Sequence, residues 1–413
     1  MLSSTWRSRS MRGALAIGAA AALVLTGCSD KSTDGGAGTS GSSGAGGLKI
    51  QPVMQIDSNG KQISKSDSAS AANPAGDGKA TCPAGTAIAM AGALTGPDAA
   101  LGINIVDGVK LALDQHNKAN PGCKIELKQF DTEGDPQKAT QVIPQIVNDK
   151  SIIGLVGPAF SGETKATGKI LSDAGLVSMT ASATNETLTQ NGWTSFFRGL
   201  ANDGVQGPSV GKYLVNTAGY KKVCVIQDNT DYGTGLAKTI IEGLGSANDA
   251  SCNAGIKKGD KDFSATVTKI ASAAPDAVFY SGYYSEGAPL AQQLKSGGVK
   301  AVFVSADGTN DPQFVAQAGS SSKGAVLSCP CGPASDKFTA DYKALNGAEP
   351  GVYSVEGYDL ATILGKGIDG GKLTRPDLLE YVRSYDSNGL ARQYKWNATG
   401  ELSNALIWIY EVK

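Results

Sequence analysis

The middle of the chain alternates short apolar runs with segments whose apolar residues recur every three or four positions. One apolar run, Ile152 to Val156, ends in a Gly-Pro turn; a helical pattern follows from Ser161, and a second apolar run ends at Met179. This order is typical of a βαβ unit with parallel strands. Ligands of open parallel sheets bind beyond the carboxyl ends of the strands. The hydroxyl side chains that follow both runs therefore predict a binding site.

Ser161 lies where the pattern predicts the start of a helix. Unpaired backbone N–H groups and the helix dipole at such a position favour a carboxylate or a phosphate. Ser161 could instead serve only as the N-cap of the helix. We favour a ligand contact in addition to the cap, because hydroxyl groups follow two consecutive predicted strands, the second group being Thr180, Ser182 and Thr184.

The same alternation continues through the rest of the chain. Strands are expected at 87–93, 123–130, 152–156, 176–179, 196–200, 222–227, 253–256, 277–281, 301–305 and 325–328. Helices separate most of them, and the alternating residues of 391–396 and 405–411 predict a β-hairpin. About 330 residues are too many for one α/β sheet, so we predict an α/β fold with two lobes of similar size.

The N-terminus predicts export. Three arginines precede an apolar run, Ala14 to Leu25, that is too short to span a bilayer and is typical of a signal peptide over residues 1–27. The residues Leu25-Thr26-Gly27-Cys28 resemble the lipobox of bacterial lipoproteins, which implies that Cys28 carries lipid. An ordinary secretory signal is the alternative. We expect a protein held by lipid at the outer face of the cytoplasmic membrane in a bacterial cell envelope.

Residues 28–80 are rich in glycine and serine and predict a flexible tether. Within them, Leu48 to Ile56 has strand-like apolar residues and could pack on the folded part, although Pro52 disfavours a strand. Without residues 1–27, which hold three arginines and no acidic residue, the chain has 34 basic and 38 acidic residues, a formal net charge of −4. No basic stripe is present, which excludes a nucleic-acid partner.

Six cysteines remain besides Cys28, and an even number in an exported chain implies disulfides. Cys82 and Cys123 lie before or at the start of two successive predicted strands, and Cys224 and Cys252 lie on another such pair. Neighbouring parallel strands bring such positions close together, so we expect bridges 82 to 123 and 224 to 252. The last two, Cys329 and Cys331, would close a very small ring or remain as thiols.

The sequence lacks the groups that an enzyme needs. Its single histidine, His116, lies at a polar helix end, so it is expected in solvent and not in a Ser-His-Asp relay. The acidic run at 131–135 resembles the opening of an EF-hand loop, but Pro136 and Val142 occupy the glycine and glutamate positions. The cysteines have no zinc-type spacing. We therefore predict no catalysis, no metal and no cofactor.

Several short motifs together resemble the type I periplasmic binding proteins, in particular the branched-chain amino acid receptors of ABC importers. The motifs are Gly92 to Pro97, Gly157 to Lys165, Ala183 to Asn185 with Leu188-Thr189, Phe197-Arg198 with Gln206 to Pro208, Asp231 to Gly233 with Gly235, Gly282 to Tyr284, and Ala306 to Gly308. The resemblance implies two Rossmann-like lobes joined by three hinge crossings, with residues 81–201 plus 333–388 in the first lobe and 202–332 plus 389–413 in the second.

The resemblance also implies roles for individual residues. The α-carboxylate of the ligand would contact Ser161 and Thr184 with nearby backbone amides, and Ser182 would offer a carbonyl to the ammonium. The second lobe would contribute Tyr232, Tyr283 and Asp307, the last as the counter-ion of the ammonium. Further contacts would fall on Gly162, Ala183, Phe160 and Leu101. Asp307 stands where the family commonly has glutamate, and Leu101 where an aromatic residue is usual.

These observations predict a monomeric receptor that closes its lobes on a small branched-chain type amino acid and delivers it to the permease subunits of an ABC importer. One alternative is a receptor for an amide, a short peptide or another amphipathic metabolite. A second is a ligand-sensing module with a membrane partner. A secreted hydrolase is the least favoured, since the chain has a single histidine.

Overall fold

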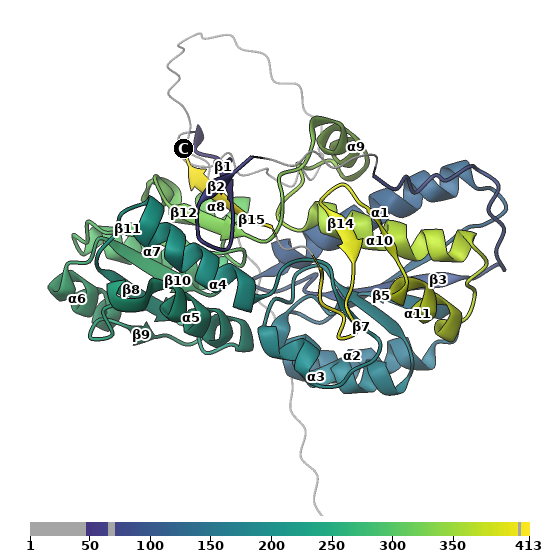
Figure 1. The fold of residues 1–413 in the computed structure, drawn as a ribbon, viewed down its shortest axis with the longest axis horizontal. Helices are drawn as coiled ribbons and strands as arrows, with labels where there is room; N and C mark the ends of the chain where they lie inside the picture. The colour runs from purple at the N-terminus through teal and green to yellow at the C-terminus, as the bar shows by residue number, and fades with distance from the viewer. Residues whose placement is uncertain (1–46, 65–70, 404–405) are drawn as a thin grey trace, which may run out of the picture. The chain divides into compact units, whose positions relative to one another are not determined.

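The computed structural model describes residues 47–64, 71–403 and 406–413, so the predicted signal peptide and Cys28 lie outside the described residues. The first sheet is parallel and has the strand order β4-β3-β5-β6-β7 (Figure 1). Its strands are β3 (Ala87–Gly92), β4 (Glu126–Asp131), β5 (Ile152–Val156), β6 (Val177–Thr180) and β7 (Phe196–Arg198). Within the described residues, six helices pack with this sheet: α1 (Ala99–Ala119), α2 (Pro136–Asn148), α3 (Ser161–Asp173), α9 (Asp336–Asn346), α10 (Ser354–Asp369) and α11 (Arg375–Arg383). We call this sheet with its helices lobe 1.

The second sheet has the order β2-β1-β15-β12-β11-β10-β8-β9. Five of its strands are parallel: β8 (Val223–Gln227), β9 (Ala254–Gly255), β10 (Ala277–Ser281), β11 (Val302–Ser305) and β12 (Val326–Cys329). Strand β15 (Ile407–Val412) is antiparallel to β12. Five helices of the described part of the chain pack with this sheet: α4 (Asp203–Lys212), α5 (Asp231–Leu244), α6 (Ser264–Ala273), α7 (Tyr284–Ser296) and α8 (Pro312–Ala318). We call this unit lobe 2.

The predicted α/β fold with two lobes is confirmed, because the described residues form two sheets, each with its own helices. The chain passes between the sheets after β2 (Gln62–Ile63), after β7, after β12 and before β15, so the passage after β2 adds to the three that the resemblance implies. The predicted hairpin of 391–396 and 405–411 is wrong. Strand β14 (Gln393–Lys395) pairs with β13 (Asp386–Asn388), across the predicted lobe boundary at 388/389, while β15 joins the second sheet. The buried Ile407 and Ile409 of β15 pack in the core of lobe 2, which a two-stranded hairpin could not provide.

The flexible tether predicted for 28–80 does not describe residues 50–63, which form strands β1 (Ile50–Ile56) and β2 (Gln62–Ile63). Strand β1 runs antiparallel to β15 from Ile50 opposite Val412 to Ile56 opposite Ile407, side by side in Figure 1. The register shifts between Pro52 and Met54, and such an irregularity lets an edge strand hold a proline. Strand β1 thereby covers the edge that β15 would otherwise expose.

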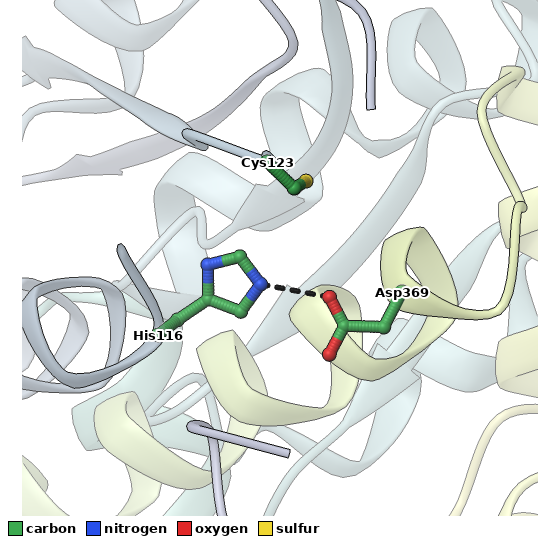
Figure 2. Close-up of side chains that lie close together, drawn as sticks. All are labelled: His116, Cys123 and Asp369. Atoms are coloured by element: carbon green, nitrogen blue, oxygen red, sulfur yellow. Dashed lines mark hydrogen bonds and ion pairs between the residues drawn. The ribbon is translucent and has the colours of Figure 1, made fainter. Parts of the chain in front are cut away.

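The prediction of a solvent-exposed histidine is wrong. His116 is buried in α1, where its Nε2 lies 2.7 Å from Asp369 Oδ1 in α10 (Figure 2). Its Nδ1 lies 3.0 Å from Asn117 Oδ1. Among the described residues, His116, Asp369 and Cys123 form the only close set of three side chains of metal-ligand type. Cys123 is bonded to Cys82 and offers no thiolate, so the set joins α1 to α10 and is not a metal centre.

This contact predicts a pH dependence of stability. Burial alone would lower the pKa of His116, but the hydrogen bonds with Asp369 and Asn117 outweigh burial and raise it. Its contribution is fully present below the unfolded-state pKa of about 6.5 and is lost as the pH rises through the higher pKa of the folded state. Urea unfolding between about pH 5.5 and 8.5 should show this loss in the wild type and not in His116→Gln. Equal pH profiles in the two proteins would contradict the assignment.

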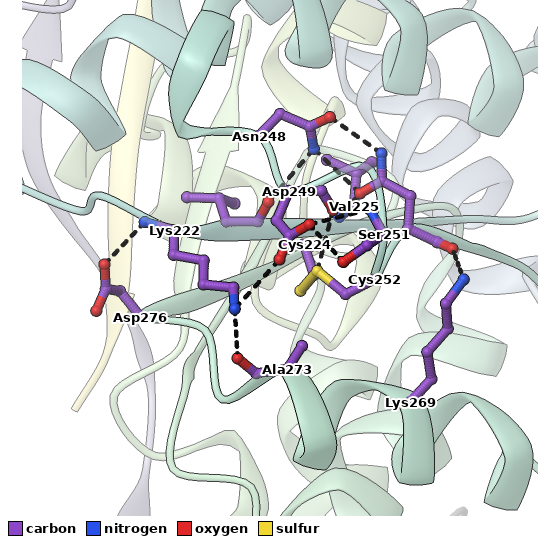
Figure 3. The surroundings of a disulfide bond; sticks show 12 residues. Lys222, Cys224, Val225, Asn248, Asp249, Ser251, Cys252, Lys269, Ala273 and Asp276 are labelled. Atoms are coloured by element: carbon purple, nitrogen blue, oxygen red, sulfur yellow. Dashed lines mark hydrogen bonds and ion pairs between the residues drawn. A yellow bond between two sulfur atoms is a disulfide. The ribbon is translucent and has the colours of Figure 1, made fainter.

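The two predicted disulfides are present, and a third joins Cys329 to Cys331. The Cα atoms of the three pairs are 4.6, 5.4 and 4.9 Å apart, within the range that a disulfide spans. Figure 3 shows Cys224 of β8 beside Cys252, which lies in the turn before β9. The Lys222 ammonium also contacts this turn, because its Nζ lies 3.2 Å from Asp249 Oδ2. This bridge fixes the turn that leads into the edge strand β9.

Candidate functional site

A small cavity lies between the two lobes at the carboxyl ends of their strands. Seven of the ten residues predicted for the site line it: Leu101, Phe160, Ser161, Ser182, Tyr232, Tyr283 and Asp307. Ala159 and Tyr353 complete the lining, and the sequence analysis identified neither. Tyr353 precedes α10 with a left-handed φ of 69°, which turns the chain back toward the cavity from a position far along the sequence. No local pattern reports such a return.

The lobe 1 side of the cavity offers hydrogen-bond donors at the start of α3. Phe160, not Ser161, is the N-cap, because the backbone N–H of Phe160 donates to Glu163 Oε2 at 3.1 Å and Ser161 is the first helical residue. Ser161 Oγ accepts from the backbone N–H of Asn185 at 3.2 Å. The described residues provide no acceptor for the Ser161 hydroxyl proton. Ser161 therefore presents a free donor beside the positive end of the helix dipole.

Ser182 differs from Ser161 although both line the cavity. The Ser182 hydroxyl donates to the backbone carbonyl of Ala159 at 2.5 Å, so its proton is already used. This contact joins the loop after β6 to the loop after β5. Ser182 thus shapes the wall, whereas Ser161 has a donor to spare.

The other three predicted residues do not line the cavity. Gly162 lines an outer cleft next to it, and Ala183 and Thr184 are fully buried behind the wall. The Thr184 hydroxyl makes no hydrogen bond of ordinary geometry with the described residues, and the Thr184 carbonyl accepts from the backbone N–H of Asp203 at 2.8 Å.

Arg198, at the end of β7, holds the loop that carries these residues. It is fully buried and donates to the backbone carbonyls of Ala183 and Asn185, while its Nη2 lies 2.8 Å from Glu401 Oε1. Burial alone would raise the pKa of Glu401, but the charge and hydrogen bonds of Arg198 outweigh it and hold that pKa below its usual value. The Phe197-Arg198 motif therefore has a positioning role behind the cavity.

The lobe 2 side of the cavity is built around Asp307. This carboxylate accepts from Tyr353 Oη at 2.6 Å, Gln206 Nε2 at 2.8 Å and Tyr232 Oη at 3.2 Å. Burial raises the pKa of Asp307, and these hydrogen bonds oppose the effect. Gly308 follows directly, and a Cβ there would lie 2.7 Å from the Tyr232 ring, so this turn needs glycine. Asp307 is a preorganised acceptor that its neighbours already hold in place.

A second carboxyl near Asp307 has no counterpart in the sequence analysis. Asp203 is fully buried at the start of α4, and neither of its oxygens makes a hydrogen bond of ordinary geometry with the described residues. Burial and the charge of Asp307 raise its pKa well above the usual value. Gln206 lies one helical turn after Asp203 and donates to Asp307, which explains why Asp203 and Asp307 lie close together. The lobe 2 side is therefore the acidic half of the site.

The two lobes also contact each other outside the cavity, in part at an outer cleft that adjoins it. The Asn185 side-chain amide donates to the backbone carbonyl of Asp231 at 2.6 Å, and Asn104 Nδ2 donates to Asp311 Oδ2 at 2.8 Å. Three ion pairs also join the lobes: Lys165 with Asp231 at 2.6 Å, Lys258 with Asp98 at 3.0 Å, and Lys238 with Glu186 at 3.1 Å.

None of the helices in the described part of the chain is long and apolar enough to span a membrane.

Comparisons with known proteins agree with this architecture. A family model described as periplasmic binding protein matches residues 86–413. The chain is similar to the leucine-, isoleucine-, valine-, threonine- and alanine-binding protein of Pseudomonas aeruginosa, with 30% identity over 78% of this chain and 89% of that protein. It is also similar to the leucine-specific-binding protein of Salmonella typhimurium, with 28% identity over 78% of this chain and 90% of that protein.

A solved structure shows the same fold. The branched-chain amino acid transporter substrate-binding protein LivJ of Streptococcus pneumoniae, in complex with isoleucine, superposes with a TM-score of 0.73 and 26% identity over 79% of this chain and 99% of that one. The family model spans the first sheet, the second sheet except for β1 and β2, and all nine residues of the cavity. The chain therefore belongs to the type I periplasmic binding proteins.

Proposed function

We propose that this protein is a lipid-anchored, extracytoplasmic substrate-binding protein of an ABC importer, and that it captures a small amino acid of the branched-chain type by closing its lobes. One observation carries the proposal: a cavity between the lobes has free donors on one side and a buried carboxylate on the other. Proteins of this family bind solutes for transporters and are not enzymes. Permease subunits are the expected partners, and we expect a monomer.

The chemistry of the two sides suits a zwitterion. The α-carboxylate would accept from the Ser161 hydroxyl and the first N–H groups of α3, where the helix dipole favours an anion. The ammonium would lie toward Asp307, with the neutral or charged Asp203 behind it. Leu101, Phe160 and Tyr283 supply an apolar wall for a short side chain.

A receptor for an amide or another amphipathic metabolite is the second candidate. Asp307 already accepts hydrogen bonds from three side chains, so it does not depend on a ligand ammonium to satisfy its buried oxygens. A ligand that brings only one donor to this side would therefore also be accommodated.

Two measurements test the proposal. Mass spectrometry of small molecules released from the denatured, purified protein should identify a branched-chain amino acid, and calorimetry with L-leucine, L-isoleucine and L-valine should show binding. Small-angle scattering should give a smaller radius of gyration with the amino acid than without it, because ligand contacts to both lobes favour the closed state. Binding without compaction would reject hinge closure and keep the receptor role.

Ser161→Ala should weaken amino-acid binding by about 1.5 to 3 kcal/mol, since it removes a hydrogen bond to a charged group. Ser182→Ala is the matched control, because that hydroxyl lines the same cavity but donates to Ala159. Calorimetry should show the larger loss for Ser161→Ala. Equal losses would mean that the carboxylate does not bind at the start of α3.

Cys28→Ser should release the protein from membranes or block its maturation, because a lipid on Cys28 is the anchor that we propose. Fractionation of cells that express each protein, followed by mass spectrometry of the N-terminal peptide, checks this. A variant that stays with the membrane fraction to the same extent as the wild type would refute lipid anchoring through Cys28.

A further inference from the structure

Two aromatic rings separate the enclosed cavity from the outer cleft. Phe160 belongs to lobe 1 and Tyr283 to lobe 2, their ring centroids are 5.1 Å apart, and both line the cavity as well as the cleft. The ammonium of Lys258, in the loop after β9, lies 5.6 Å from the centroid of Phe160 and 5.0 Å from that of Tyr283. These distances allow cation–π attraction to both rings. Lys258 thus covers the seam where the two lobes meet above the cavity.

Lys258 is held at this seam from both lobes. Its Nζ lies 3.0 Å from Oδ2 of Asp98, the residue before α1 in lobe 1. The Asp98 side chain is fully buried, and neither of its oxygens accepts a hydrogen bond of ordinary geometry from the described residues. Within lobe 2, the backbone N–H of Lys258 donates to Asn229 Oδ1 at 2.8 Å. Asp98 therefore relies on a cation that only contact between the lobes supplies.

Two more buried carboxyls feel the same charge. Burial raises the pKa of Glu163 in lobe 1 to about 7 and that of Asp228 in lobe 2 to about 6, and the charge of Lys258 opposes the shift in both. Contact between the lobes thus gathers carboxyl groups from both sides around one ammonium. Separating the lobes would take Lys258 away from Asp98 and uncover the Phe160–Tyr283 seam in the same movement.

We propose that the Lys258–Asp98 ion pair is a gate over the cavity, which forms when the lobes meet and limits how fast a bound ligand leaves. This inference rests on the proposed function in so far as the cavity holds the ligand. Lys258 and Asp98 are positioning residues, because they act on the ligand through the two rings and do not line the cavity. The gate should slow dissociation more than association, because a ligand enters while the lobes are apart and the pair is not formed.

Stopped-flow fluorescence with L-leucine tests the gate in the full mature protein. Lys258→Met keeps an unbranched side chain over the rings and removes the charge. We expect its dissociation rate constant to rise about tenfold, with an association rate constant within about twofold of the wild type. Asp98→Asn keeps the shape at the other end of the pair and removes no helix cap, since Asp98 makes no side-chain capping bond. It should raise dissociation similarly, and the double variant should add little, since both changes break one contact.

Lys165→Met is the matched control. Lys165 also pairs across the lobes, with Asp231 at 2.6 Å, but its side chain is 58% exposed, against 29% for Lys258, and it contacts neither ring. An exposed pair contributes little, so its dissociation rate constant should change less than about twofold. An unchanged rate in both Lys258→Met and Asp98→Asn, or an equal rise in Lys165→Met, would overturn the gate.

A second measurement needs no ligand. Hydrogen exchange of the ligand-free proteins should be faster around residues 96–101 and 256–263 in Lys258→Met than in the wild type, and unchanged there in Lys165→Met. If L-leucine does not bind the wild type, the proposed amino-acid function fails, and exchange still decides on the gate. Equal exchange in all three proteins overturns it. Thermal unfolding confirms that each variant is folded, and Asp98→Asn takes the place of Lys258→Met if the latter is not.

Discussion

Asp307→Ala is expected to abolish measurable amino-acid binding in calorimetry. An ammonium enclosed between the lobes needs an anionic partner, and removing one member of a buried charge pair costs about 3 to 5 kcal/mol, which is a loss of more than about a hundredfold in affinity. Asp307 is 1% exposed and is the carboxylate of the cavity wall, while Ser161 and the start of α3 face the opposite charge. The loss of amino-acid affinity in Asp307→Ala should therefore come from the missing contact with the ammonium.

Tyr353→Phe is the control that separates lost charge from lost packing. It removes the 2.6 Å hydrogen bond to Asp307 and keeps both the ring and the carboxylate. One hydrogen bond to a charged group accounts for about 1.5 to 3 kcal/mol, so Tyr353→Phe should bind the amino acid more weakly than the wild type and more tightly than Asp307→Ala.

The matching 2-keto acid, which has no ammonium, should bind the wild type poorly. The keto acid would lose the ion pair with Asp307, although the three hydrogen bonds that Asp307 accepts let the carboxylate stay buried without an ammonium. Comparing the two ligands therefore tests the ligand class directly. If Asp307→Ala binds the amino acid as tightly as the wild type, or if the wild type prefers the keto acid, the amino-acid assignment is wrong. The receptor for another metabolite would then become the leading interpretation.

Glu356→Ala should destabilise the folded protein by about 3 to 5 kcal/mol, because it leaves Arg392 buried and unpaired. Arg392 Nη2 lies 2.5 Å from Glu356 Oε1, and the two side chains are 3% and 1% exposed. Burial raises the pKa of Glu356, and the charge of Arg392 opposes this effect. Arg392 Nη1 also donates to the backbone carbonyl of Pro330 at 2.6 Å, at the passage from lobe 2 to lobe 1.

Urea unfolding followed by circular dichroism measures this loss. Glu380→Ala is the control, since Glu380 pairs with Arg383 at 3.6 Å on the surface and should change the free energy of unfolding by less than about 1 kcal/mol. A loss below about 1 kcal/mol in Glu356→Ala would show that water reaches Arg392, and that this pair does not fix the crossing.

The order of most strands and helices, and the edge of the sheet at which the cavity lies, follow from the sequence alone. Apolar runs and helical periodicity are local, and the carboxyl ends of parallel strands meet at one edge whatever the details of packing. Ser161 follows from this rule, whereas Tyr283 and Asp307 were assigned to the site through the resemblance to a known family, and all three line the cavity. The bridges of Cys82 with Cys123 and of Cys224 with Cys252 followed for the same reason, since they depend on neighbouring strands, whereas the sequence left the state of Cys329 and Cys331 open.

Which side chains reach the cavity depends on the tertiary structure. Thr184 lies behind the wall and Tyr353 lies in it, because side-chain position there depends on contacts between residues far apart in the chain. The partner of β1 is β15, which lies more than 300 residues later in the chain. His116 is buried although it lies at a polar helix end, because α10 brings Asp369 next to it. Strand pairing and the burial of polar groups depend on contacts with residues far away in the chain, and the local sequence pattern does not identify those residues.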